Sequence, residues 1–136
     1  GCEGVGRLGK GMGDIQVCAP RVAQHALAPM LTSMTSWREE NRERIAARAT
    51  VFRTAMDDLP GWNLLSSGAY FGYVRHPFTG VGSRQLAETM ARKAGVLVIP
   101  GAFFGAGQDG ALRFAFANAG RNVIAKLAGR LSSLTL

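Results

Sequence analysis

One arginine lies on a predicted strand whose pattern leaves space beside it. In the segment 111–117 (ALRFAFA), strict alternation puts Leu112, Phe114 and Phe116 on one face. Arg113 falls on the other face, flanked by alanines. A guanidinium group is planar, and its paired N–H donors match the two oxygens of a carboxylate. The pattern makes Arg113 a candidate anion-binding residue, with a salt bridge at the core edge or plain exposure as the alternatives.

Two glycine-rich patterns near the N-terminus resemble phosphate-binding loops, but neither has the required context. Residues 4–9 spell GxGxxG, a dinucleotide-binding turn, yet the three residues before them are too few for the strand that this turn follows. Residues 4–10 also match most of a P-loop, but Gly11 stands where a hydroxyl must bind magnesium. We therefore expect no nucleotide site.

The other reactive side chains are isolated from one another. His25 lies in an apolar helical pattern and His76 precedes a proline, and no serine or cysteine is placed to act as a nucleophile with either. Asp57 and Asp58 end a predicted helix and are expected to be solvated. Cys18 is expected to be a small buried apolar residue. The two cysteines form no CxxC or cysteine–histidine group, so neither a metal site nor a disulfide framework is predicted.

Composition and charge indicate a folded domain with no membrane segment. The chain has 136 residues, of which 47% are hydrophobic and 18% charged. Its net charge of +7 raises the alternative of a nucleic-acid-binding domain, but the basic cluster at 38–53 has glutamates interleaved and favours a solvated helix face. No run of about 18 apolar residues and no signal-peptide pattern occurs, so we expect a cytoplasmic protein without nucleic-acid or membrane partners.

Hydrophobic periodicity predicts the elements that position these residues. Residues 1–13 contain six glycines and are expected to form a flexible lead, or the frayed end of a longer element, before a domain spanning 14–136. In chain order the patterns predict first a helix from Pro20 that Pro29 bends or ends, and then a long helix over 36–59 with a capping box at Ser36 and Glu39. Two strands over 62–65 and 70–75 follow, and then a helix that is capped by Ser83 and ended by Gly95. The last elements are strands over 96–99 and 111–116 and a helix over 122–134 with Val123, Leu127, Leu131 and Leu134 aligned. The order ααββαββα predicts an α/β (α+β) fold in which helices pack on a small mixed sheet of about four strands.

Five segments resemble, in order, motifs of the C-terminal small domain of fold-type I, class I/II aminotransferases. They are 17–24 (VCAPRVAQ, the family's xCxPxxxQ), 67–71 (SGAYF, its GAFY strand), 94–101 (AGVLVIPG, its GVxVxPG), 104–105 (FG) and 112–117 (LRFAFA, its hRhshA strand). The resemblance covers about residues 14–134. It implies a part of an enzyme that uses pyridoxal 5′-phosphate (PLP) to transfer an amino group between an amino acid and a 2-oxo acid.

The resemblance also implies roles for single residues. Arg113 would bind the substrate α-carboxylate, and the pocket would be bordered by Gly68, Ala69 and Tyr70, with a loop at its mouth formed by Pro100, Gly101 and Phe103. The family's Schiff-base lysine lies in an SxxK segment before the 17–24 motif and is absent from this chain, since Lys10 and Arg7 are expected in the helix leading to that motif. No catalytic residue is therefore predicted, and the fragment alone is expected to be inactive.

The resemblance further implies partners for the intact enzyme. These are its own large PLP-binding domain and a second copy of the chain, because the loop with Cys18 and Pro20 approaches the partner's active site in such dimers. A free-standing small-molecule or anion-binding module without catalysis is the alternative function.

Overall fold

The computed structural model describes residues 20–135. They fall into two compact units, one ending at Glu40 and the other beginning at Asn41. The expectations for the glycine-rich lead, for its two phosphate-binding patterns and for both cysteines concern residues outside the described range.

Helix α2 (Arg21–Leu27) follows Pro20 and gives way to a 3₁₀ turn over Ala28–Met30. Pro29 has no N–H group to donate to the preceding turn, so an α-helix cannot continue through it without losing a hydrogen bond. The prediction that Pro29 ends this helix is confirmed.

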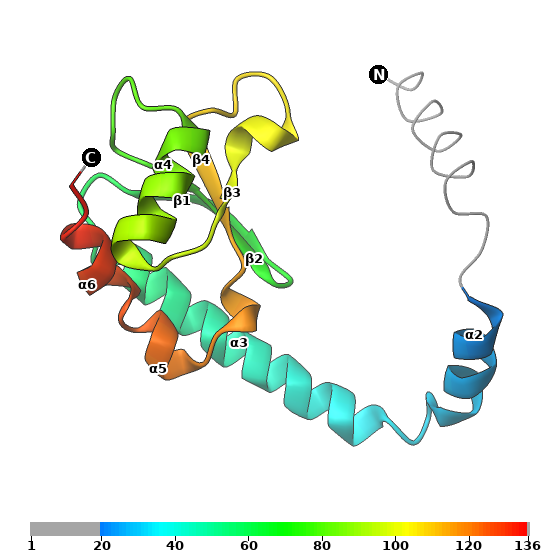
Figure 1. The fold of residues 1–136 in the computed structure, drawn as a ribbon. Helices are drawn as coiled ribbons and strands as arrows, with labels where there is room; N and C mark the ends of the chain where they lie inside the picture. The colour runs from blue at the N-terminus through cyan, green and yellow to red at the C-terminus, as the bar shows by residue number, and fades with distance from the viewer. Residues whose placement is uncertain (1–19, 136) are drawn as a thin grey trace. The chain divides into compact units, whose positions relative to one another are not determined.

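Helix α3 (Thr35–Asp57) is the long helix that the sequence predicts (Figure 1). It begins before Ser36, because the N–H of Arg38 already donates to the carbonyl of Met34 at 2.9 Å. Ser36 therefore lies in the first turn and does not occupy the predicted N-cap position. The buried residues of α3 all lie in its second half, as its charged first turns predict: Phe52, Ala55 and Met56.

Four strands form the sheet that the sequence predicts. They are β1 (Asn63–Gly68), β2 (Phe71–Arg75), β3 (Ile99–Pro100) and β4 (Ala111–Phe114), in the order β1-β2-β4-β3. The helices of the same unit are the second part of α3 with α4 (Ser83–Thr89), α5 (Arg121–Ile124) and α6 (Leu127–Ser132). The α+β class and the number of strands are confirmed.

The sheet is antiparallel throughout, which corrects the expected mixed sheet. All three neighbouring pairs run antiparallel. Because β2 and β3 are both antiparallel to β4, they run in the same direction, as a helical crossover through α4 allows. β4 lies between these two strands, so the sheet contains no parallel pair.

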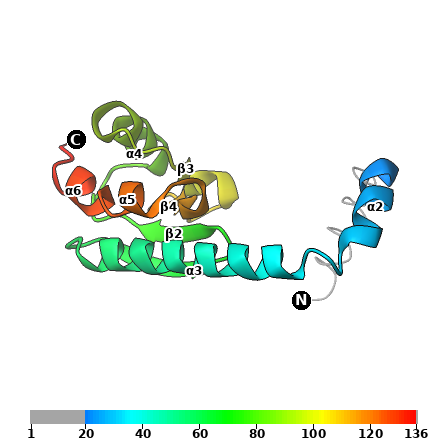
Figure 2. The same ribbon diagram turned by 90° about the horizontal axis from the view of Figure 1, so that it is seen from below.

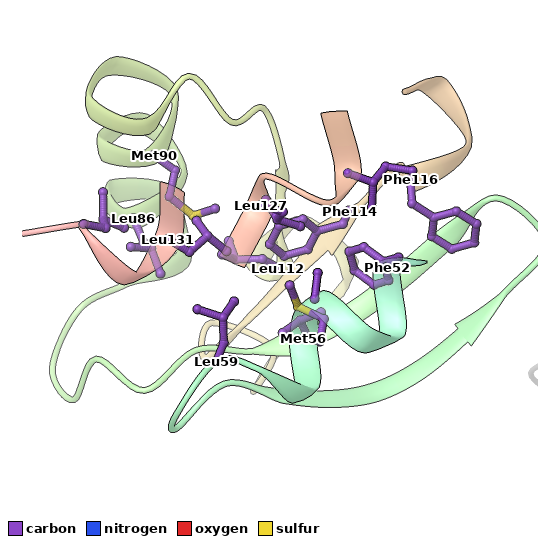
Figure 3. Close-up of a cluster of buried hydrophobic side chains, with 14 residues drawn as sticks. Phe52, Met56, Leu59, Leu86, Met90, Leu112, Phe114, Phe116, Leu127 and Leu131 are labelled. Carbon is purple, nitrogen blue, oxygen red and sulfur yellow. The ribbon is translucent and has the colours of Figure 1, made fainter. Parts of the chain in front are cut away.

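The core lies against one face of the sheet. Val74, Leu112 and Phe114 occupy alternate positions on paired strands, so their side chains share a face. They form one cluster with apolar side chains of all four helices (Figure 3). Figure 2 shows α5 and α6 in the space between α3 and α4. The helices thus cover one face of the sheet and leave the other to loops.

Three strands differ from their predicted bounds, and one of them is β4, which ends at Phe114 because Phe116 begins a 3₁₀ turn. β1 continues through residues 66–68, where a loop was expected, because Ser66 and Ser67 still pair with β2 after a bulge that follows Leu64. The hairpin turn is therefore at Ala69 and Tyr70, and Ala69 has a φ of +47°. In the predicted buried strand 96–99 only Ile99 pairs, together with Pro100, and Leu97 is 85% exposed.

The C-terminal helix is divided in two, which corrects the single predicted helix. Residues 125–126 form a turn in which the N–H of Lys126 donates to the carbonyl of Val123 at 3.2 Å. Ile124, before the turn, and Leu127, after it, both reach the core. Val123, predicted to be buried, is 48% exposed.

One basic residue of α3 departs from the solvated face that was expected. Arg48 is half-buried, and its Nη1 donates to the carbonyl of Ala117 at 2.5 Å. Ala117 lies just after β4, in the 3₁₀ turn Phe116–Asn118. The arginine therefore ties the chain that leaves β4 to α3.

Gly72 is required where β2 crosses α3. An added Cβ would overlap the ring of Phe52, which is itself buried. We predict that Gly72→Ala lowers the free energy of unfolding by about 1–3 kcal/mol, the usual effect of overpacking a core. Thermal unfolding measures this, with Gly110→Ala as the control, because an added Cβ at Gly110 meets nothing within 4 Å. Equal stability of the two variants would contradict this packing.

Candidate carboxylate-binding site

Arg113 lies on β4, on the face of the sheet opposite the core. It is half-buried, and its strand neighbours are Tyr73 on β2 and Ile99 on β3. Leu112 and Phe114, on either side of it, are 0% and 4% exposed. The predicted alternation of this strand is confirmed, and it directs the guanidinium away from the helices.

Two aromatic rings hold the guanidinium of Arg113. Its central carbon lies 4.4 Å from the ring centroid of Phe71 and 4.8 Å from that of Phe104. Both distances are within the range of cation–π attraction. Arg113 forms no hydrogen bond or ion pair with any residue that the structure describes. Its N–H donors therefore remain available to an anion.

The loop 101–110 brings Phe104 to this site, and Tyr73 anchors the loop. The hydroxyl of Tyr73 donates to Oε1 of Gln108 at 2.9 Å, and its ring meets that of Phe104 edge-on, with centroids 6.1 Å apart. Gly101 is enclosed, since an added Cβ would lie 2.5 Å from the carbonyl oxygen of Ala111. The loop thus starts pressed against the sheet.

Asp109 fixes the other end of this loop to α4. Its Oδ1 accepts from the backbone N–H of Ser83 at 2.8 Å and from the Ser83 hydroxyl at 2.7 Å. The Ser83 hydroxyl oxygen in turn accepts from the N–H of Ala102 at 3.2 Å. Ser83 was predicted to cap α4 with its own side chain. The structure corrects this, because the capping oxygen comes from Asp109 and Ser83 is the first residue of the helix.

These hydrogen bonds also act on the charge of Asp109. The Ser83 hydroxyl and backbone N–H lower the pKa of the Asp109 carboxyl, and the nearby His76 and Arg84 add to that effect.

Helix α4 continues through a π-helical turn (Met90–Ala94) and ends at Gly95, whose φ of +62° is left-handed. The predicted C-terminal end of this helix is confirmed.

The other predicted site residues lie at different depths around Arg113. Gly68, Ala69 and Tyr70 form the exposed end of the β1–β2 hairpin, next to Phe71. Pro100 and Gly101 are buried. Phe103 is 60% exposed and lies under the guanidinium of Arg84, at 4.7 Å, so in this structure it does not contact Arg113.

Sequence reasoning missed the aromatic partners of Arg113. Phe71 and Phe104 were noted only as letters of motifs. For Phe71 part of a signal was present, because it is two residues from Tyr73 and therefore shares a sheet face with it, but the pairing of this strand with β4 was not predicted. For Phe104 there was none, since its position depends on the path of the loop.

Other candidates do not assemble into a second site. His25 is exposed and accepts from Nε of Arg21 at 3.4 Å, while His76 is 8% exposed with Nε2 3.4 Å from the carbonyl oxygen of Asp109. Asp57 and Asp58 are exposed. Over the described part of the chain, no three His, Cys, Asp or Glu side chains gather as metal ligands. Among the helices of residues 20–135, none has the length and apolar character of a membrane span.

The sequence and the fold together define the family of this chain. Residues 12–131 match the family model described as aminotransferase class I and II, so the chain belongs to that family. It is 29% identical over 104 residues to aromatic-amino-acid aminotransferase 2 of Thermococcus litoralis, and equally to an aspartate aminotransferase of Pyrococcus abyssi. Each alignment covers 75% of this chain and 27% of the relative.

Solved aminotransferases contain the same fold. The aromatic aminotransferase of Pyrococcus horikoshii matches with a TM-score of 0.62 and 26% identity, over 71% of this chain and 26% of that one. The α-aminoadipate aminotransferase LysN of Thermus thermophilus matches with a TM-score of 0.70 and 24% identity, over 95% of this chain and 34% of that one. The fold is that of the C-terminal small domain of fold-type I aminotransferases. The chain spans about a quarter of the length of the relatives it matches.

Asp109 gives a prediction about stability and pH. Because folding lowers the pKa of this carboxyl, its charged form stabilises the folded chain at neutral pH. We predict that Asp109→Ala lowers the melting temperature at pH 7. The difference from the parent should shrink as the pH falls below about 4, where the carboxyl of the unfolded chain becomes protonated, and be smallest below the lowered pKa of the folded parent. Asp57→Asn, at an exposed position in the last turn of α3, is the control and is not expected to lower it. A difference that stays constant down to pH 2 would contradict the role of the charge.

Proposed function

We propose that this chain is the small domain of a PLP-dependent aminotransferase, in which Arg113 binds the α-carboxylate of the amino-acid or 2-oxo-acid substrate. The observation that carries the proposal is the free guanidinium of Arg113, held by two rings on the open sheet face of a chain from the aminotransferase family. In this proposal residues 14–136 form the domain and residues 1–13 lead into it. The large PLP-binding domain belongs to the rest of the protein.

Arg113 has the properties that carboxylate binding requires. A carboxylate can accept two parallel N–H bonds from a guanidinium, which sets its orientation as well as its position. The rings of Phe71 and Phe104 exclude water from part of the guanidinium, and an ion pair is stronger where less water surrounds it. PLP, when bound, stabilises the negative charge that develops at the substrate α-carbon. The contribution of Arg113 is to hold that carbon in one orientation.

The described residues do not form a PLP site by themselves. The cofactor requires a lysine amine, and the structure describes Lys93 and Lys126. Nζ of Lys93 donates to the carbonyl of Thr135 at 2.9 Å, and Lys126 precedes α6 on the helical side of the sheet. We therefore propose that the lysine lies in the large domain, and that the open face with Arg113 is turned toward it.

The remaining site residues are proposed to shape the pocket around Arg113. The exposed hairpin end, Gly68 to Tyr70, and Phe103 would border the substrate. Pro100 and Gly101 are buried, which suits a role in holding the loop at the mouth of the pocket. A homodimer is proposed for the complete enzyme from the family resemblance of the segment with Pro20.

The amino donor is not specified by this domain. Arg113 would bind only the carboxylate that all amino acids share. The two relatives with equal identity are named for aromatic amino acids and for aspartate, so similarity favours neither substrate.

Replacing Arg113 in the complete enzyme tests the proposal. Arg113→Ala should raise KM for the amino donor and lower kcat/KM by roughly tenfold to a hundredfold or more, the effect of losing a charged hydrogen-bond pair worth about 1.5–3 kcal/mol. Arg113→Lys should recover only part of the loss, because an ammonium lacks the planar pair of donors. Steady-state kinetics with an amino acid and a 2-oxo acid measure both.

The control is Arg121→Ala, which removes an exposed arginine from the start of α5, and its kinetics should match the parent. Parent-like kinetics of Arg113→Ala would refute the carboxylate role. An inactive complete protein that still binds amino acids through Arg113 would instead favour a binding module without catalysis.

A further inference from the structure

We propose that Phe71 and Phe104 form an aromatic clamp that positions Arg113 for carboxylate binding, and that Tyr73 is a positioning residue that sets Phe104 in place. This inference rests on the proposed function, because it explains how the arginine of that site is oriented. The term "clamp" below means the rings of Phe71 and Phe104.

The first ring of the clamp is placed by the sheet itself. Tyr73 lies directly opposite Arg113 in the β2–β4 pair. Phe71 is two residues before Tyr73, so it projects from the same face, and a diagonal neighbour on an adjacent strand is within reach of a long side chain. The 4.4 Å distance from the Arg113 guanidinium carbon to the Phe71 centroid results from this register.

The second ring is placed by the loop after β3. Phe104 is the last residue of the 3₁₀ turn Gly101–Phe104. Tyr73 holds this turn in two ways, through the edge-on contact with the Phe104 ring and through its 2.9 Å hydrogen bond to Gln108 farther along the loop. Gly101 adds a third restraint, because an added Cβ would come within 2.9 Å of the Tyr73 hydroxyl. Phe104 therefore reaches Arg113 only while the loop stays against Tyr73.

Aromatic rings hold a guanidinium without competing for its donors. An acidic neighbour would also fix Arg113, but its oxygens would occupy the N–H groups that the substrate needs and would neutralise the charge. A ring attracts the cation through its π face and accepts no strong in-plane hydrogen bond. The clamp thus restricts the long arginine side chain before the carboxylate arrives, which reduces the entropy lost on binding.

The test measures binding of a carboxylate to the complete enzyme. Phenylacetate carries a carboxylate and no amino group, and phenylacetamide is its neutral match. We expect Phe104→Leu to raise the inhibition constant of phenylacetate by about threefold to tenfold, the effect of losing one cation–π contact. Phe104→Tyr, which keeps the ring, should have the inhibition constant of the parent for phenylacetate. The inhibition constant of phenylacetamide should be the same in the parent and in both variants. Tyr73→Phe should raise the phenylacetate constant less than Phe104→Leu does.

Each outcome separates the clamp from the proposed function. If Arg113→Ala weakens phenylacetate binding but Phe104→Leu does not, the clamp is wrong and the carboxylate role of Arg113 stands. If Arg113→Ala has no effect, the proposed function fails. The clamp would be overturned if Phe104→Leu and Phe104→Tyr raised the inhibition constant of phenylacetate equally. It would also be overturned if Phe104→Leu raised the inhibition constants of phenylacetate and phenylacetamide equally. Either result would assign Phe104 to loop packing. Phe104 is 46% exposed, so these variants leave no core cavity.

Discussion

The alternation of β4 is the constraint on which the rest of the structure depends. This strand pairs on both sides, with β2 and β3, and its two faces serve different purposes. Leu112 and Phe114 join the core while Arg113 faces away from it. A slip of one residue in the pairing would bury the guanidinium and expose both apolar side chains. Gly72 fixes β2 against α3, since only a glycine lets β2 lie against the ring of Phe52. Packing of the core and orientation of the arginine are therefore set together.

The position of Arg113 could be predicted from the sequence because strand alternation is a local pattern. Its surroundings could not, because they depend on contacts between segments far apart in the chain. Phe71 reaches Arg113 through the register of the β2–β4 pair, and Phe104 reaches it through a loop held by Tyr73 and Gln108. Aromatic residues next to strands are most often core residues, so nothing in their type marked these two as partners of a cation. Both residues belong to the family motifs, but the motifs assign no role to either of them.

The fold class could be predicted for the same reason, and the errors in it are non-local. Apolar spacing identified the long helix, the hairpin and the central strand. It could not show that β4 lies between β2 and β3, or that α4 is capped by Asp109 and not by Ser83, its own first residue. It also could not show the turn at Lys126, where one predicted helix becomes two.

The two edges of the sheet bear on how the chain behaves while it is being made. An edge strand exposes unpaired N–H and carbonyl groups that can recruit a strand of another molecule. Here β1 is interrupted by a bulge after Leu64, and β3 is two residues long and ends in Pro100, which has no N–H to donate. Phe71 and Phe104 are exposed, so newly synthesised copies can come into contact through apolar surface. Neither edge of the sheet then offers a long, regular strand with which another copy could pair. The irregular edge strands β1 and β3 thus oppose the pairing of this domain with strands of other molecules.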